Sequence, residues 1–175
     1  DGVINDSHRT VIGIPNPSWL FSMNNSLSYK GFELSVFLQG IAGNKIYNAN
    51  NIDNTGMAAA YNQTTDVLKR WQGEGTSNSM PRAVFGDPNQ NTRVSDRFVE
   101  NGSYLRLKNI TLSYTFPKQW LQKAQIENAR LSLSCENVAT ITGYSGFDPE
   151  VGINGIDQNR YPISRTFSLG LNFNF

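Results

Sequence analysis

The chain has 175 residues, with 15 Lys and Arg against 14 Asp and Glu, and a net charge of +1. The length allows one domain with a sizeable core, and the balanced charge argues against nucleic acid as the main partner. A single Cys and a single His exclude a disulfide framework and a Cys/His zinc site. No run approaches the ~20 consecutive apolar residues of a transmembrane helix. A mean hydropathy of -0.42 does not exclude membrane strands, because these are only half apolar.

Alternating apolar and polar residues predict strands with two different faces. We expect five strands, near residues 18–30, 32–47, 103–116, 129–141 and 165–175. A tight hairpin at Lys30-Gly31 joins the first two strands. The predicted fold class is all-β, an antiparallel meander.

The connections between these strands alternate in length. Residues 48–101 and 142–164 are two long loops, whereas the other connections are short. Because alternate connections of an antiparallel meander lie on the same side, the long loops share one side and the short links the other. An outer-membrane barrel shows this asymmetry, with short periplasmic turns and long external loops.

Two short helices are expected in the connections. Thr65 can cap a turn over residues 66–72, where Val67, Leu68 and Trp71 share a face. Pro117 is well placed to start a second helix over residues 118–124.

The last run has the clearest alternation. Its even positions are small or polar, from Thr166 to Asn174. Its odd positions are all apolar: Phe167, Leu169, Leu171, Phe173 and Phe175. A slip of one residue would exchange the two faces completely, so this register is strongly specified.

A soluble sandwich would also alternate, with its apolar face inside. Three features favour lipid on the apolar side and water on the other. The polar faces carry Ser, Thr and Asn, and charged residues make up 17% of the chain, below the ~25% of soluble domains. Aromatics such as Trp19, Tyr29, Tyr104 and Phe116 sit at strand ends, and the runs match the ~9–11 residues that cross a bilayer. Arg106 and Lys108 share the alternation of Ile110 and are expected at the external rim.

Five strands cannot span a membrane alone, because an open sheet leaves unpaired N–H and C=O groups in hydrocarbon. We therefore expect the chain to be part of a larger barrel, with the missing strands before Asp1.

Several segments resemble, in order, the C-terminal portion of the SusC/RagA family of TonB-dependent outer-membrane transporters. They are residues 6–17, 28–39, 43–48 (Gly-Asn-Lys-Ile-Tyr-Asn), 96–117, 136–151 (Glu-Asn-Val-Ala-Thr-Ile-Thr-Gly-Tyr-Ser-Gly-Phe-Asp-Pro-Glu-Val) and the terminal Phe175. The resemblance covers nearly all of residues 1–175 and implies the last five or so strands of a barrel of about 22 strands in the bacterial outer membrane.

The resemblance also implies partners and substrates. The expected partners are a plug in the barrel, TonB, which contacts an energy-coupling box in the absent N-terminal part, and a SusD-like surface lipoprotein. Glycans or peptides are the expected cargo. The terminal run resembles the signal that the barrel-assembly machinery recognises, ending in the aromatic Phe175.

Candidate contact residues lie in the loops and on the predicted lumen face. Trp71, Tyr144, Phe147 and Tyr161 either contact substrate or lid, or form the loops' own small cores. Arg130 and Glu136 face the lumen, where they either line a substrate path or pair across strands.

No metal or cofactor is expected, although two places were considered for calcium. Residues 1–6 (Asp-Gly-Val-Ile-Asn-Asp) resemble the tail of a calcium loop, but its earlier ligands are missing. Asp148, Glu150 and Asp157 can gather a cation, but their spacing matches no known loop.

No catalytic motif is present, since His8 is the only His and has no Ser or Cys motif beside it. The chain is therefore predicted not to be an enzyme but part of an active nutrient importer. The alternatives are a secreted β-sandwich that binds glycans and, more distantly, a barrel enzyme.

Overall fold

The computed structural model describes residues 5–175, except for the side chain of Asp6. Its contacts divide it into two compact units. We call residues 17–43, 102–143 and 162–175 the sheet unit, and residues 5–16, 44–101 and 144–161 the loop unit.

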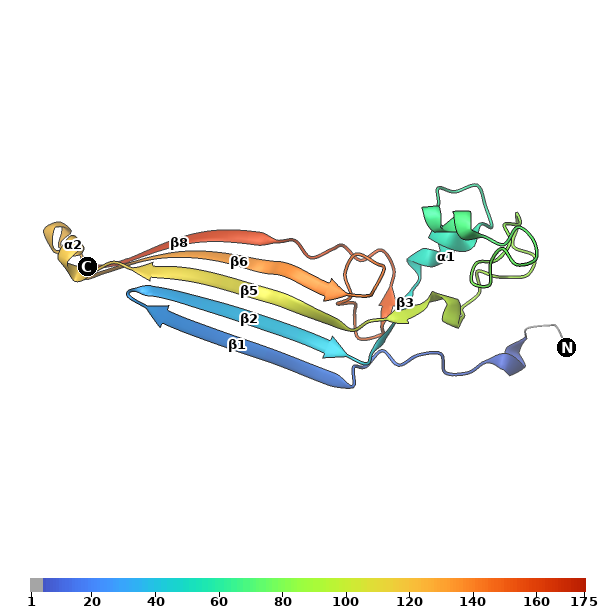
Figure 1. Ribbon diagram of the computed structural model, residues 1–175, viewed down its shortest axis with the longest axis horizontal. Helices are drawn as coiled ribbons and strands as arrows, with labels where there is room; N and C mark the ends of the chain where they lie inside the picture. The colour runs from blue at the N-terminus through green and yellow to red at the C-terminus, as the bar shows by residue number, and fades with distance from the viewer. Residues whose placement is uncertain (1–4) are drawn as a thin grey trace. The chain divides into compact units, whose positions relative to one another are not determined.

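The sheet unit is a single antiparallel sheet of five long strands (Figure 1). The strands are β1 (Trp19–Tyr29), β2 (Phe32–Ala42), β5 (Tyr104–Thr115), β6 (Asn128–Thr142) and β8 (Thr166–Asn174). Each pairs with the next long strand along the chain, in the order β1-β2-β5-β6-β8. This confirms the predicted all-β meander.

The short connections leave the same end of this sheet. Lys30 and Gly31, with φ of 47° and 86°, form the two-residue turn between β1 and β2, where Tyr29 faces Phe32. These left-handed values suit a hairpin whose turn must follow the twist of its strands. Between β5 and β6, Pro117 precedes α2 (Lys118–Leu121), and the turn η4 (Gln122–Ala124) completes the predicted short helix.

The strand register places side chains of the same kind beside one another across all five strands. One row consists of leucines only: Leu27, Leu34, Leu112, Leu133 and Leu169. The neighbouring row on the opposite face consists of hydroxyls only: Ser26, Ser35, Thr111, Ser134 and Ser168. Because each row is one residue from the other on every strand, any single-residue slip would mix leucines with hydroxyls.

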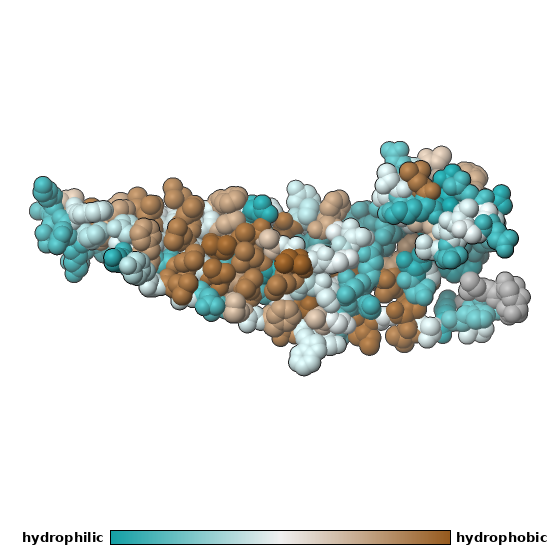
Figure 2. Space-filling model, in the orientation of Figure 1, coloured by the Kyte–Doolittle hydropathy of each residue, from teal (hydrophilic) through white to brown (hydrophobic). Residues whose placement is uncertain are grey.

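The apolar face of this sheet is open. Leu27 is 65% exposed, Leu133 52% and Leu169 75%, and apolar side chains gather over the strands in Figure 2. A β-sandwich would bury these leucines under a second sheet. Among the described residues no second layer covers these leucines as the alternative prediction of a sandwich requires.

A bulge corrects the prediction for Arg106 and Tyr104. Leu38 faces Leu107 while Phe37 faces Asn109, so Lys108 is an extra residue in β5. The extra residue exchanges the two faces beyond it, and Leu105 and Leu107 join the apolar face. Arg106, predicted at the apolar rim, lies on the polar face instead, 2% exposed and donating from Nε to Thr140 Oγ1 over 2.9 Å. Tyr104 has the same parity and lies beneath the Arg106 guanidinium.

The second strand ends earlier than predicted. Residues 32–47 were expected as one strand, but β2 stops at Ala42 and Gly43 turns with φ of 88°. A side chain at Gly43 would also meet Ser18 Oγ at 2.7 Å, so both the angle and the space require glycine here. The residues after it form a separate strand of the loop unit.

The loop unit has a small sheet of its own, which the sequence did not predict. Its strands are β3 (Lys45–Asn48), β4 (Val99–Asn101) and β7 (Ile156–Asp157), in the order β4-β3-β7. Its helical turns are η1 (Asp6–His8), α1 (Asn50–Gly56), η2 (Thr65–Lys69) and η3 (Asp96–Phe98). Ile46 and Phe98, 0% and 1% exposed, form its core. Within residues 5–175 no helix is long and apolar enough to cross a membrane.

Candidate functional site

An ion pair lies on the polar face of the sheet unit. Arg130 Nη2 on β6 donates to Glu33 Oε2 on β2 over 2.8 Å, and each side chain is 40% exposed. β5 runs between them, and its Ser113, which faces Glu33 in register, is 3% exposed. A charged pair thus bridges three strands over a small residue.

Glu136, the other predicted lumen residue, does not pair with Arg130. It faces Asn109 and Thr166 in register, six residues farther along β6. At ~3.3 Å per residue this places it roughly 20 Å from Arg130, beyond the reach of an ion pair. Both residues lie on the polar face, as predicted, but the partner of Arg130 is Glu33.

The loop unit is organised around the carboxylate of Glu100 in β4. Its oxygens accept hydrogen bonds from Asn48 Nδ2 at 2.9 Å, Asn51 Nδ2 at 3.2 Å, Ser145 N at 2.8 Å and Ser145 Oγ at 2.7 Å. These donors come from β3, from α1 and from the second long connection. One carboxylate therefore joins three separate segments of this unit, in place of a larger apolar core.

Tyr144 belongs to the same interior. It is 6% exposed, and its hydroxyl donates to Asp157 Oδ2 over 2.6 Å. Burial, and then the hydrogen bond and charge of Asp157, raise the pKa of Tyr144 well above its ordinary value of 10.0. The structure therefore gives Tyr144 a role within the loop unit, because a buried ring has no surface to offer a substrate or lid.

The acids considered for calcium have other partners. Asp157 accepts from Tyr144 and from Arg160 N, and Asp148 accepts from Glu150 N at 2.8 Å. Among the described residues no group of three or more His, Cys, Asp or Glu is placed to share a metal ion. The possible calcium loop of residues 1–6 lies largely outside the described residues.

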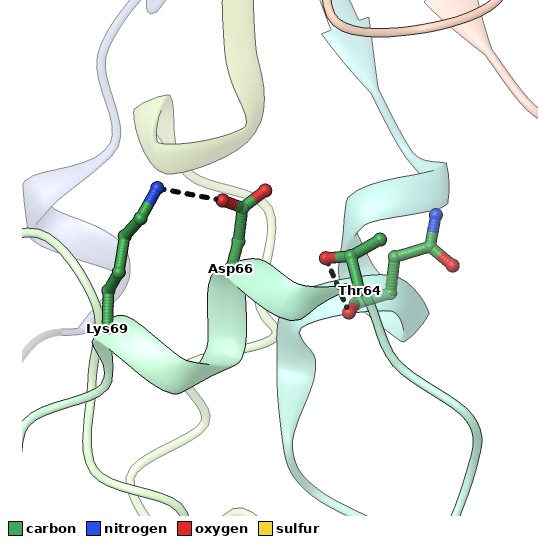
Figure 3. A network of polar contacts seen from close by, with 4 residues as sticks. Thr64, Asp66 and Lys69 are labelled. Atoms are coloured by element: carbon green, nitrogen blue, oxygen red, sulfur yellow. Dashed lines mark hydrogen bonds and ion pairs between the residues drawn. The ribbon is translucent and has the colours of Figure 1, made fainter.

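The turn η2 begins and ends differently from the prediction. It is a 3-10 turn that starts at Thr65, and Thr64 precedes it without a side-chain cap. Thr64 Oγ1 donates instead to Asn54 O over 3.4 Å. Lys69 Nζ pairs with Asp66 Oδ1 at 3.0 Å, and Figure 3 shows these two side chains pointing toward each other. Because the turn ends at Lys69, Trp71 lies beyond it rather than on its face.

Asp87 arranges the next part of the loop unit. It accepts hydrogen bonds from Asn91 N, Thr92 N and Thr92 Oγ1. Burial opposes its ionisation, but the bonds from Thr92 and Asn91 and the charge of Arg93 lower the pKa of Asp87 overall. Burial lowers the pKa of Arg97, although the charge of Asp87 opposes this shift. The Arg97 Nη2 donates to Thr55 O at 2.9 Å.

These segments surround a depression of about 1420 Å³. Its walls come from residues 5–12 and from two stretches of the long connection, 71–82 and 89–97. Trp71 lines it, 36% exposed, with the Arg82 guanidinium 5.9 Å from the ring centroid. Of the four predicted aromatic contacts, Trp71 alone lines this depression.

Phe147 and Tyr161 are 80% and 88% exposed and do not line the depression. Their contact with substrate or lid stays a prediction. His8 accepts from Asn5 N through Nδ1 at 3.2 Å and lines the same depression as Trp71.

The sequence reasoning missed Glu33, Glu100 and Arg82. Glu33 had a signal, since it is the one charged residue of β2. Glu100 and Arg82 had none, because their positions depend on contacts between segments far apart in the chain.

No protein-family model matches the chain. It is 34% identical to TonB-dependent receptor P3 of Formosa agariphila, over 100% of this chain and 18% of that receptor. It is 31% identical to TonB-dependent receptor SusC of Bacteroides thetaiotaomicron, over 100% of this chain and 17% of that receptor. The chain therefore spans less than a fifth of the length of these relatives.

The chain is also similar to part of two solved structures of an importer. The RagAB peptide importer in its 'closed-closed' state superposes with a TM-score of 0.78 and 29% identity, over 91% of this chain and 17% of that chain. Its 'open-open' state superposes with a TM-score of 0.77 and 27% identity, over the same shares.

Proposed function

The chain belongs to the SusC/RagA family of TonB-dependent receptors, and from this premise we propose that its five long strands form part of the wall of an outer-membrane importer. The loop unit then supplies the external loops of that wall. The cargo is a glycan or a peptide; the similar solved structures are those of a peptide importer.

The row of five leucines opposite the row of five hydroxyls carries this proposal. A leucine row across the whole sheet suits acyl chains, whereas a hydroxyl row suits a water-filled lumen. Phe32, Tyr114 and Phe116 lie together at the end with the short connections. Their centroids are 4.5 Å apart in a tilted pair and 5.1 Å apart in an edge-to-face pair. Such aromatics mark the membrane interface.

The free edges of the sheet support a larger assembly. Within residues 5–175, β1 and β8 each pair on one side only. Their other sides present rows of N–H and C=O groups, which in hydrocarbon require further strands. In this proposal the partners are the other strands of the barrel, its plug, a SusD-like lipoprotein, TonB, and the barrel-assembly machinery, which engages the terminal run ending at Phe175.

The proposal includes no catalytic step and no resident cofactor. The similar proteins are named as receptors and importers. Two charged residues of the sheet's polar face, Arg130 and Glu33, form an ion pair with each other. We assign them to the lining of the lumen.

Substitution of adjacent residues on β8 tests the proposal. Leu169→Arg places a charge in the leucine row, at an expected cost of ~2–4 kcal/mol at mid-bilayer. Ser168→Arg places the same charge in the hydroxyl row, where water solvates it. In the full-length receptor, we expect Leu169→Arg to reduce sharply the amount of heat-modifiable barrel recovered from outer membranes. Ser168→Arg should assemble like the unmodified protein, and equal recovery of the two variants would refute the assignment of the faces.

A further inference from the structure

The depression of the loop unit gathers positive charge. Four arginines line it, Arg9, Arg82, Arg93 and Arg97, with Asp96 as the one carboxylate in its lining. The chain as a whole is nearly neutral, at +1. Even with the neighbouring Asp87 included, this part of the loop unit is distinctly basic, so it attracts anions.

Two of these arginines are held in place by neutral oxygens. Arg93 donates from Nε to Gln90 O at 2.9 Å and from Nη2 to Asn89 O at 2.8 Å. Arg97 donates to Thr55 O and, more weakly at 3.3 Å, to Asn91 O. These carbonyl oxygens hold the two guanidinium groups in position, and the charge of Asp87 acts on both of them.

Arg82 is exposed, as is Arg9, whereas Arg93 and Arg97 are partly buried. The Arg82 guanidinium lies 5.9 Å from the centroid of the Trp71 ring, which orients it at the wall of the depression. A planar guanidinium binds carboxylate or sulfate oxygens through paired hydrogen bonds, and an indole offers a flat apolar surface to a sugar ring.

The shape and lining favour an oligosaccharide over a peptide. A volume of about 1420 Å³ exceeds the ~300–1,000 Å³ of common small-ligand sites, which suits an oligomer. Amides and hydroxyls such as Asn78, Ser79 and Gln90 line it and match sugar hydroxyls. Extended peptides commonly add to a free strand edge, but the lining contains no residue of β3, β4 or β7.

We propose that this depression binds an acidic oligosaccharide, with Arg82 contacting its carboxylate or sulfate groups and Trp71 stacking on a sugar ring. This inference rests on the proposed function, because it makes the depression a contact site for the imported cargo. It narrows that cargo to an acidic glycan.

Binding to the full-length receptor in detergent tests the inference. The probes are hexagalacturonate, which carries carboxylates, a sulfated neocarrahexaose, neutral maltohexaose, and a hexaglutamate peptide. The variant is Arg82→Gln. The matched control is Lys69→Gln, which also removes one positive charge from this connection but at a side chain 77% exposed, paired with Asp66 and outside the depression (Figure 3).

We expect at least one acidic oligosaccharide to bind more tightly than maltohexaose, and more weakly as the salt concentration rises. The carboxylated and sulfated probes show which anion is preferred. Arg82→Gln should weaken this binding by about tenfold to a hundredfold, the usual range for losing a charge-assisted hydrogen bond, and Lys69→Gln by less than about twofold. Trp71→Phe should retain part of the binding, since a smaller aromatic surface remains.

Equal binding of maltohexaose and the acidic glycans, preference for hexaglutamate, absence of binding, or equal effects of Arg82→Gln and Lys69→Gln would each overturn the inference. None of these results touches the barrel assignment, which the pair Leu169→Arg and Ser168→Arg decides. If the receptor assembles normally but Arg82→Gln does not weaken glycan binding more than Lys69→Gln, only the acidic site is refuted.

Discussion

The sheet unit and the loop unit bury apolar side chains to different extents. In the sheet unit the leucine row stays open, with Leu169 75% exposed, whereas Ile46 and Phe98 of the loop unit are 0% and 1% exposed. The loop unit thus contains its own core. The sheet unit has backbone ladders and an ordered register but leaves its apolar face for the surroundings to cover.

The polar groups differ in the same way. In the loop unit, the carboxylates of Glu100, Asp157 and Asp87 each accept at least two hydrogen bonds from within the unit. On the sheet, the ion pair of Arg130 and Glu33 is 40% exposed on each side. The loop unit thus satisfies these three carboxylates internally, whereas water reaches the ion pair on the polar face of the sheet unit.

The largest expected difference comes from truncating core side chains. Phe98→Ala should destabilise the loop unit by ~3–5 kcal/mol, because it leaves a cavity where the ring was 1% exposed. Leu133→Ala on the sheet should cost much less, since acyl chains fill the vacated space. The measurement is the proteolysis rate of residues 48–101 and the unfolding temperature of the barrel, both in the full-length receptor. Equal destabilisation by Phe98→Ala and Leu133→Ala would contradict the difference in core burial between the two units.

The sheet could be predicted because its pattern is periodic. Alternation in residues 165–175 places Phe167 and Leu169 on one face, as in the structure, where they face Cys135 and Leu133. The bulge at Lys108 also left a signal: apolar residues are odd-numbered at Leu105 and Leu107 and even-numbered from Ile110. Such a change of parity within one strand indicates an inserted residue.

The loop unit could not be predicted in the same way. Phe98 and Ile46 become a core only when β3 and β4 pair, 50 or more residues apart, with Lys45 facing Asn101. Short strands of three or four residues carry too little alternation to identify, and polar contacts such as Asn48 to Glu100 follow no fixed spacing. The basic depression likewise depends on contacts between distant segments, so no sequence pattern beyond Trp71 indicates it.

A smaller, pH-dependent effect is expected at Tyr144. Its pKa in the folded protein is raised above 10.0, so its stabilising contribution is complete below pH 10 and is lost as the pH rises beyond it. Tyr144→Phe removes the bond to Asp157 and should cost ~1–3 kcal/mol at pH 7. The proteolysis rate of residues 144–161 in the full-length receptor should therefore differ between variant and unmodified protein at neutral pH. The difference should narrow above pH 10.

Tyr161→Phe serves as the control for this experiment, because Tyr161 is 88% exposed. It should match the unmodified protein at every pH. A difference for Tyr144→Phe that stays constant through high pH would show that its hydroxyl does not titrate as the buried contact requires.

The smallest effect is expected at the ion pair of the sheet, and its size reports which solvent covers the polar face. In a double-mutant cycle of Glu33→Gln and Arg130→Gln, we expect a coupling energy of ~0.2–1 kcal/mol that decreases with salt, as for pairs in water. The cycle is measured as barrel unfolding in the full-length receptor. Ser113, 3% exposed between the two partners, is small enough that neither single variant should disturb the strands.

A coupling above ~3 kcal/mol that salt does not change would mean that the pair lies in a dry interior, because only there does losing one partner leave a charge without solvation. That result would place water on neither face of the sheet and would contradict the lumen assignment, whereas a weak, salt-sensitive coupling agrees with a water-filled channel on the side opposite the leucines.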